Sequence, residues 1–184
     1  LEVQAIGDLI SGSEVHTGAR VSEPGVRRMS DRGLLRNYKV LHFATHGLVV
    51  PEVPELSAIV LSQFAQQDSI YDGYLTMAEI SSLDLKADFV NLSACETGLG
   101  KIYAGEGMVG LTQAFLVAGA NGLSVSLWQV SDESTMRFMT GLYALVDRDT
   151  TSYSRALTEM KRQFIEEGEY ASPFYWAPFV YYGK

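Results

Sequence analysis

The sequence predicts an α/β sandwich with a mainly parallel sheet. Short apolar runs of strand length alternate with longer segments in which apolar residues recur at helical spacing. The runs that read as strands cover residues 38–44, 57–62, 88–94 and 122–128. Strands that alternate with helices in this way are typical of α/β proteins.

The N-terminal half is expected to contain three short helices. Residues 1–10 carry apolar side chains at 1, 3, 6, 9 and 10, which suits a helix. Ser22-Glu23-Pro24 can start a second helix, because proline is favoured at the first helical position and Ser22 or Glu23 can cap it. Thr76-Met77-Ala78-Glu79 has the T-x-x-E pattern of a capping box and opens a helix to about residue 83.

The C-terminal half is expected to be richer in helix. A glycine-rich loop over residues 98–105 precedes it, and an edge strand is expected at its end. The predicted helices cover 106–118, 132–146 and 152–167, and the edge strand covers 179–182. The long apolar stretch at 110–130 is interrupted by Gly119-Ala120-Asn121-Gly122, so a helix followed by a strand explains it better than a membrane span.

Composition and charge narrow the class of protein. The 184 residues are 47% hydrophobic and 20% charged, which is ordinary for a globular protein and enough for one domain. The net charge of −8, from 14 basic and 22 acidic residues, argues against direct binding of nucleic acid or an anionic membrane. A single cysteine allows no internal disulfide, and no signal peptide is visible, so we predict a cytoplasmic protein.

His46 and Cys95 are the candidate catalytic pair. Each follows an apolar run that reads as a buried strand, and the histidine stands 49 residues before the only cysteine. A lone cysteine with a histidine about 50 residues upstream is the spacing of caspase-type proteases. In a parallel α/β sheet, sites form beyond the carboxyl ends of the strands, so both residues are expected at one edge.

The chemistry of this pair points to nucleophilic catalysis. A histidine within hydrogen-bond reach supplies the base that a thiol needs near neutral pH. The backbone N–H groups of Gly47 and Cys95 are expected to form an oxyanion hole, in which one donor can contribute roughly 3–4 kcal/mol. The alternative for Cys95 is a small buried apolar residue, a common fate of free cysteine.

Several motifs, in order along the chain, resemble the CHAT family, a caspase-like domain often found after tetratricopeptide repeats. They are His42-Phe43-Ala44-Thr45-His46-Gly47, Leu92-Ser93-Ala94-Cys95-Glu96-Thr97-Gly98, Gly105-Glu106-Gly107, residues 114–120, Ser126-Leu127-Trp128-Gln129-Val130-Ser131-Asp132 and residues 173–179. The resemblance implies a caspase-like three-layer α/β/α sandwich related to caspases, separases and gingipains. It also implies that His46 is the base and Cys95 the nucleophile of a cofactor-free peptidase acting on a protein substrate. A regulatory region such as tetratricopeptide repeats is the expected partner.

Asp132 is a candidate substrate-binding residue. Trp128-Gln129-Val130-Ser131-Asp132 is similar to a W-x-V-x-D segment of separases, whose acid lines the pocket for a basic residue before the cut. The resemblance implies that Asp132 receives Arg or Lys. In the alternative interpretation, Asp132 or Ser131 merely caps the following helix.

Two further expectations concern His42 and the N-terminus. His42 and His46 form H-x-x-x-H, but the helix and the glutamate of H-E-x-x-H are missing, so we predict no metal and a hydrogen-bonded structural role for His42. CHAT domains usually carry a strand and more chain before the helix that resembles residues 1–10. The sequence starts at Leu1, so we expect a domain without its N-terminal strand and upstream regions.

The sequence therefore predicts a cysteine endopeptidase. The alternative is a catalytically silent caspase-like module that acts by interaction, although such a module has no need of both His46 and Cys95. A serine hydrolase is poorly supported, because no G-x-S-x-G elbow is present.

Overall fold

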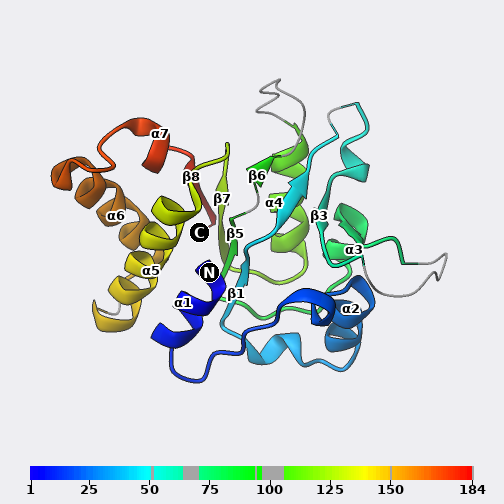
Figure 1. Ribbon diagram of the computed structural model, residues 1–184. Helices are drawn as coiled ribbons and strands as arrows, with labels where there is room; N and C mark the ends of the chain where they lie inside the picture. Colours follow the sequence, from blue (N-terminus) through cyan, green and yellow to red (C-terminus); the bar gives the residue numbers. More distant parts are fainter. Residues whose placement is uncertain (51, 64–70, 94, 97–105, 150, 184) are drawn as a thin grey trace. The chain divides into compact units, whose positions relative to one another are not determined.

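A computed structural model describes residues 1–50, 52–63, 71–93, 95–96, 106–149 and 151–183 (Figure 1). The predicted glycine-rich loop at 98–105 lies outside the described residues. The chain divides into two compact units. The sheet unit consists of His16–Val125 with Tyr182–Lys184, and the helical unit consists of Leu1–Val15 with Ser126–Tyr181.

The first sheet of the sheet unit contains three parallel strands in the order β1-β5-β7. These strands are β1 (Val40–Phe43), β5 (Phe89–Leu92) and β7 (Gly122–Ser126). Every residue of β5 and β7 is buried, as is usual for strands inside a parallel α/β sheet.

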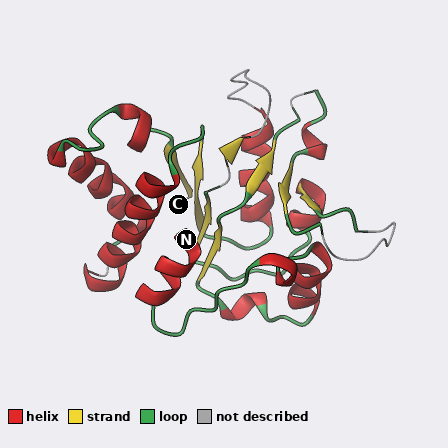
Figure 2. Ribbon diagram, viewed as in Figure 1, coloured by secondary structure: helices red, strands yellow, loops and turns green. Residues whose placement is uncertain are grey.

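A second sheet follows directly from the first, with the order β4-β3-β2-β6. Its strands are β2 (His46–Leu48), β3 (Ala58–Val60), β4 (Tyr74–Thr76) and β6 (Cys95–Glu96). The β3 strand pairs antiparallel with β2 and β4, whereas β2 and β6 run parallel. The chain therefore passes from β1 into β2 and from β5 into β6 (Figures 1 and 2). His46 and Cys95 follow the ends of β1 and β5, and each residue also opens a second short strand.

Helices α2 (Glu23–Asp31), α3 (Met77–Ser81) and α4 (Glu106–Val117) belong to the same unit, with short 3-10 turns at Gly18–Arg20, Leu35–Asn37 and Pro54–Leu56. The α4 helix packs on β1, where the rings of Phe43 and Phe115 lie 5.7 Å apart. The α3 helix approaches α4 closely at Gly110, where an added Cβ would lie 2.4 Å from Met77 Cε. The small residue at 110 thus allows the two helices to touch.

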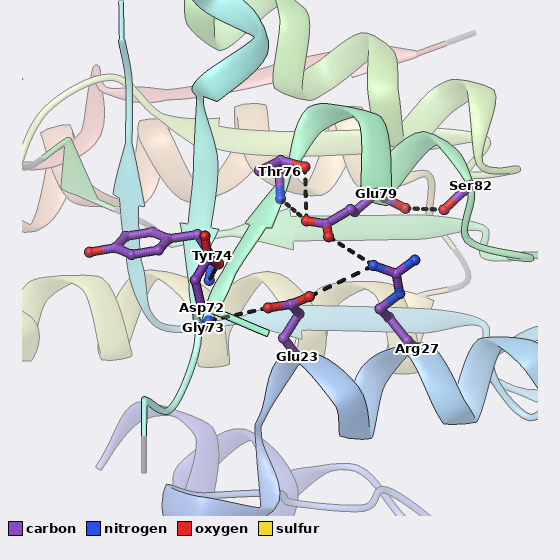
Figure 3. Close-up of polar contacts among 8 residues, drawn as sticks. All are labelled: Glu23, Arg27, Asp72, Gly73, Tyr74, Thr76, Glu79 and Ser82. Atoms are coloured by element: carbon purple, nitrogen blue, oxygen red, sulfur yellow. Dashed lines mark hydrogen bonds and ion pairs between the residues drawn. The ribbon is translucent and has the colours of Figure 1, made fainter. Parts of the chain in front are cut away.

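The predicted capping box at the start of α3 is confirmed. Thr76 N donates to Glu79 Oε2 at 2.8 Å, and the threonine side chain accepts from the backbone of position 79. Figure 3 shows that Glu79 also joins a polar cluster with α2. Arg27 Nη1 donates to Glu79 Oε1 at 2.8 Å, and Glu23 Oε2 accepts from Gly73 N at 3.2 Å. The cluster ties α2 to the segment that leads into β4 and α3.

The Glu23 carboxyl makes stability depend on pH. Its side chain is 1% exposed. Burial raises the pKa of Glu23 above its usual value, the Gly73 N–H opposes this, and the charges of Glu79 and Asp72 raise the pKa further. A carboxyl with a raised pKa in the folded state binds its proton more tightly there than in the unfolded chain. Its stabilising contribution is therefore present below about pH 4.5 and is lost as the pH rises through the folded-state pKa.

We expect Glu23→Gln to stabilise the protein more at pH 7.5 than at pH 4.5, relative to wild type. The neutral amide keeps an oxygen for Gly73 N and removes the buried charge. Urea midpoints at the two pH values measure the effect. Glu55→Gln is the control, because Glu55 is exposed. An equal difference between Glu23→Gln and wild type at both pH values would contradict this prediction.

The helical unit contains α1 (Glu2–Leu9), α5 (Asp132–Asp149), α6 (Tyr153–Glu167), α7 (Pro173–Trp176) and the first three residues of β8 (Phe179–Gly183). The α5 and α6 helices pack side by side (Figure 1). An aromatic core joins them to β8, because the Phe138 ring stacks on Phe179 at 4.4 Å and meets the edge of Phe164 at 5.2 Å. All three side chains are at most 1% exposed.

The predicted fold class is confirmed. The elements form an α/β fold in which β1, β5 and β7 run parallel, as expected for a caspase-like domain. Most predicted helices and strands are present within one to three residues of their expected bounds. In the described part of the chain, no helix has the length and apolar character needed to cross a membrane.

Candidate active site

His46 and Cys95 lie directly opposite each other in neighbouring parallel strands. In the β2–β6 pair, His46 is in register with Cys95, and Gly47 is in register with Glu96. Neighbouring strands lie about 4.8 Å apart, so this register sets the backbones of His46 and Cys95 side by side. The pairing of β2 with β6 thereby brings together two residues that are 49 positions apart in the sequence.

This pairing continues the register of the first sheet. Phe43 of β1 is opposite Leu92 of β5, three residues before His46 and Cys95 respectively. The segment between β1 and β2 therefore has the same length as the segment between β5 and β6. In the segment between β5 and β6, Ser93 N donates to Phe43 O at 3.0 Å. In the segment between β1 and β2, Thr45 Oγ1 donates to Val60 O.

The surroundings of His46 suit a residue that meets a substrate. The imidazole is exposed, whereas Gly47 is buried between β3 and β6, opposite Ile59 and Glu96. His46 thus faces solvent from a strand that pairs with β3 on one side and β6 on the other. The oxyanion role of the Gly47 and Cys95 N–H groups stays a prediction.

His42 is hydrogen bonded within the first sheet, as expected for a structural histidine. Asn91 Nδ2 lies 3.3 Å from His42 Nδ1, and Ser93 Oγ lies 3.5 Å from His42 Nε2. Asn91 Nδ2 also donates to Ser93 Oγ at 2.8 Å. Within the described ranges, no three His, Cys, Asp or Glu side chains gather in a group that could hold a metal ion.

Asp132 lies in the helical unit as the first residue of α5, where its side chain is exposed. The cap of this helix is supplied by its neighbour, because Ser134 N donates to Ser131 Oγ at 3.3 Å. Trp128 Nε1 donates to Phe174 O at 3.0 Å and holds the segment before the helix. Of the two capping candidates, Ser131 therefore has that role, and the pocket role of Asp132 stays a prediction.

Sequence reasoning missed Asn91 and Ser93 as members of a polar cluster next to the candidate site. The signal was present, because Asn91 interrupts the apolar run Phe89-Val90-Asn91-Leu92 in a strand expected to be buried. A buried amide needs hydrogen-bond partners, so a polar residue in such a run indicates a specific contact.

Comparison with known proteins identifies the family. The family model described as the CHAT domain matches residues 1–184, the whole chain. The chain belongs to the CHAT domain family. The CHAT domain described here is also 31% identical over 110 residues to tetratricopeptide repeat protein 28 of Mus musculus and to the protein of the same name from Homo sapiens. The matched segment covers 60% of this chain and 4% of the length of either relative.

Proposed function

We propose that this CHAT domain is a cysteine endopeptidase in which His46 and Cys95 form the catalytic dyad. The observation that supports the proposal is the β2–β6 register, which sets these two residues opposite each other. A thiol is activated by an adjacent base, and imidazole is the usual base for cysteine in peptidases. A module that acted only by interaction would not require this pairing.

The proposed reaction has two stages. In the first, His46 takes the thiol proton, Cys95 Sγ attacks the scissile carbonyl, and the C–N bond breaks as the imidazolium returns the proton to the leaving amine. In the second, water adds to the thioester, the C–S bond breaks, and the acid product and free thiol are released. The backbone N–H groups of Gly47 and Cys95 are proposed to bind the oxyanion formed in both stages.

A protein substrate and a regulatory region complete the proposal. The relatives are named as tetratricopeptide repeat proteins, and this chain spans only 4% of their length. We propose that tetratricopeptide repeats, in the same protein or in a partner, control access to the dyad. A thiol nucleophile also fits a reducing compartment, in keeping with the predicted cytoplasmic location.

The rate of alkylation at Cys95 tests the dyad. In the activated state, we expect iodoacetamide to modify Cys95 at pH 7 faster than it modifies a model thiol, because thiolate and not thiol is the nucleophile. We expect His46→Ala to remove this excess. Mass spectrometry of the modified peptide gives both rates, and equal rates in wild type and His46→Ala, with the regulatory partner present, would rule the dyad out.

Asp132→Asn tests the proposed specificity for a basic residue before the cut. A carboxylate pairs with Arg through two hydrogen bonds, so we expect Arg substrates to be preferred over Lys substrates and neutral residues to be poor. We therefore expect Asp132→Asn to lower kcat/KM on Arg peptides far more than on Leu or Met peptides.

Ser131→Ala is the matched control for this measurement. It removes the observed helix cap and is expected to cost about 1 kcal/mol of stability, with no effect on the preference among substrates. A uniform loss across all peptides in Asp132→Asn, or a wild-type preference for neutral residues, would show that Asp132 does not select the substrate.

A further inference from the structure

A row of polar residues crosses the first sheet at a single level. His42 of β1, Asn91 of β5 and Ser124 of β7 are in register across the three parallel strands. Asn91 and Ser124 are fully buried, at 0% exposure, whereas neighbouring positions such as Val90 and Leu123 are apolar. The row therefore interrupts a largely apolar pattern in these strands.

Two members of the row form a hydrogen-bonded cluster with Ser93. The Asn91 amide donates to Ser93 Oγ at 2.8 Å and lies 3.3 Å from His42 Nδ1, so one NH₂ group serves both neighbours. With Nδ1 as the acceptor, the neutral imidazole carries its proton on Nε2, which lies 3.5 Å from Ser93 Oγ. The three side chains close a ring of polar contacts between β1 and β5.

Burial of the cluster has a cost in stability. Asn91 Oδ1 is buried and has no hydrogen-bond partner among the described residues. Replacing a whole buried polar cluster by apolar groups is often neutral or stabilising, so burial of polar atoms is not by itself evidence for stability. The best-attested use of such groups is to fix the register of neighbouring elements.

The cluster lies between β1 and β5, the strands that lead into β2 and β6 and thus to His46 and Cys95. His42 lies four residues before His46, and its partner Asn91 lies four residues before Cys95. Ser93 stands in the break between β5 and β6, where its backbone N–H also holds Phe43 O. Any slip of β5 along β1 would separate the His42–Asn91 pair and would displace Cys95 from its place opposite His46.

We propose that His42, Asn91 and Ser93 form a register lock, a cluster that holds Cys95 opposite His46. These three are positioning residues, because they act on the dyad through the strands that carry it. The structural part of this inference concerns only the pairing of β2 with β6. Its consequence for catalysis rests on the proposed function, so the two parts are tested separately.

Disulfide formation measures the pairing without any need for catalysis. Cys95 is the only cysteine of the sequence, so His46→Cys places a second thiol directly opposite it. The spacing of neighbouring strands lies within the Cα–Cα range of about 4.4–6.8 Å that disulfides allow. We expect this variant to form the disulfide rapidly under a mild oxidant. Leu48→Cys, two residues further along β2, is expected to form it slowly.

The residues of the register lock are then replaced in the full chain that carries His46→Cys. We expect Asn91→Leu to slow disulfide formation about tenfold, a change of the size carried by interactions within one hydrogen-bond network. Ser93→Ala should act in the same direction, and Ser93→Thr, which keeps the hydroxyl, should restore the rate. Ser124→Ala is the control from the same row and should leave the rate unchanged.

The outcomes separate the lock from the peptidase. Unchanged disulfide rates in both Asn91→Leu and Ser93→Ala would overturn the lock, whatever the catalytic activity of the protein. If Asn91→Leu fails to fold, the disulfide rate of Ser93→Ala alone tests the register lock. Slower disulfide formation in these variants would support the lock even if His46→Ala left the reactivity of Cys95 unchanged. Unchanged reactivity of Cys95 in His46→Ala would overturn only the proposed function.

Discussion

Replacing Cys95 by alanine is expected to reduce peptidase activity to background, because the proposed reaction has no other nucleophile. Replacing His46 by alanine should lower kcat/KM by about 10²–10⁴-fold, the usual contribution of a positioned acid–base group. Fluorogenic peptides with different residues before the cut, assayed with the regulatory partner present, measure both effects. The peptides with Arg at that position are expected to report the largest wild-type rates.

His16→Ala provides the control for the histidine variant. His16 is exposed and stands outside the strands that carry the dyad, so its replacement should leave kcat/KM unchanged. Activity retained by Cys95→Ala would contradict the dyad. Equal losses in His16→Ala and His46→Ala would show that the effect of His46 is not specific.

Phe138→Ala is expected to cause the largest loss of stability, about 3–5 kcal/mol. The ring is fully buried between Phe164 and Phe179, so its removal loses both apolar burial and two aromatic contacts. A cavity would remain at the junction of α5, α6 and β8. Urea unfolding followed by circular dichroism gives the free energy of unfolding.

Phe174→Ala is the matched control, because this ring is 51% exposed and lies in the same unit. Its replacement should cost much less than that of Phe138. Similar urea midpoints for the two variants would contradict the view that the Phe138 cluster is the core of the helical unit.

Much of the fold could be predicted because its signals are local. The capping box at Thr76 is a pattern within four residues, and the structure shows it intact. Helix α6 (Tyr153–Glu167) begins beside Ser152, whose side chain accepts from Arg155 N, and it buries one apolar face. In both places, cap and periodicity agree with the tertiary structure, so the bounds were predicted to within a residue or two.

The second sheet could not be predicted in the same way. Strands β2 and β6 contain three and two residues, too few for a periodic pattern. They exist because β3 pairs with β2 and because β1 and β5 carry their common register forward. Such pairing depends on contacts between distant parts of the chain, which local patterns do not encode.

The candidate site was predicted in part. The position of His46 and Cys95 after two apolar runs led to the expectation that they lie close together, and the backbone register places them opposite each other. The partners of Asn91 were missed, because a single polar residue in an apolar run does not reveal which strand it faces. The catalytic roles of His46 and Cys95 and the pocket role of Asp132 remain predictions.

Covalent capture by a peptide electrophile tests the central claim most directly. A peptidyl acyloxymethyl ketone with Arg next to the reactive group, added to the protein with its regulatory partner, should form one thioether adduct. We predict that peptide mapping by mass spectrometry places this adduct on Cys95 and that His46→Ala slows its formation by about 10²-fold or more. An adduct at another residue, or equal rates of capture in wild type and His46→Ala, would contradict the assignment of a His46–Cys95 dyad.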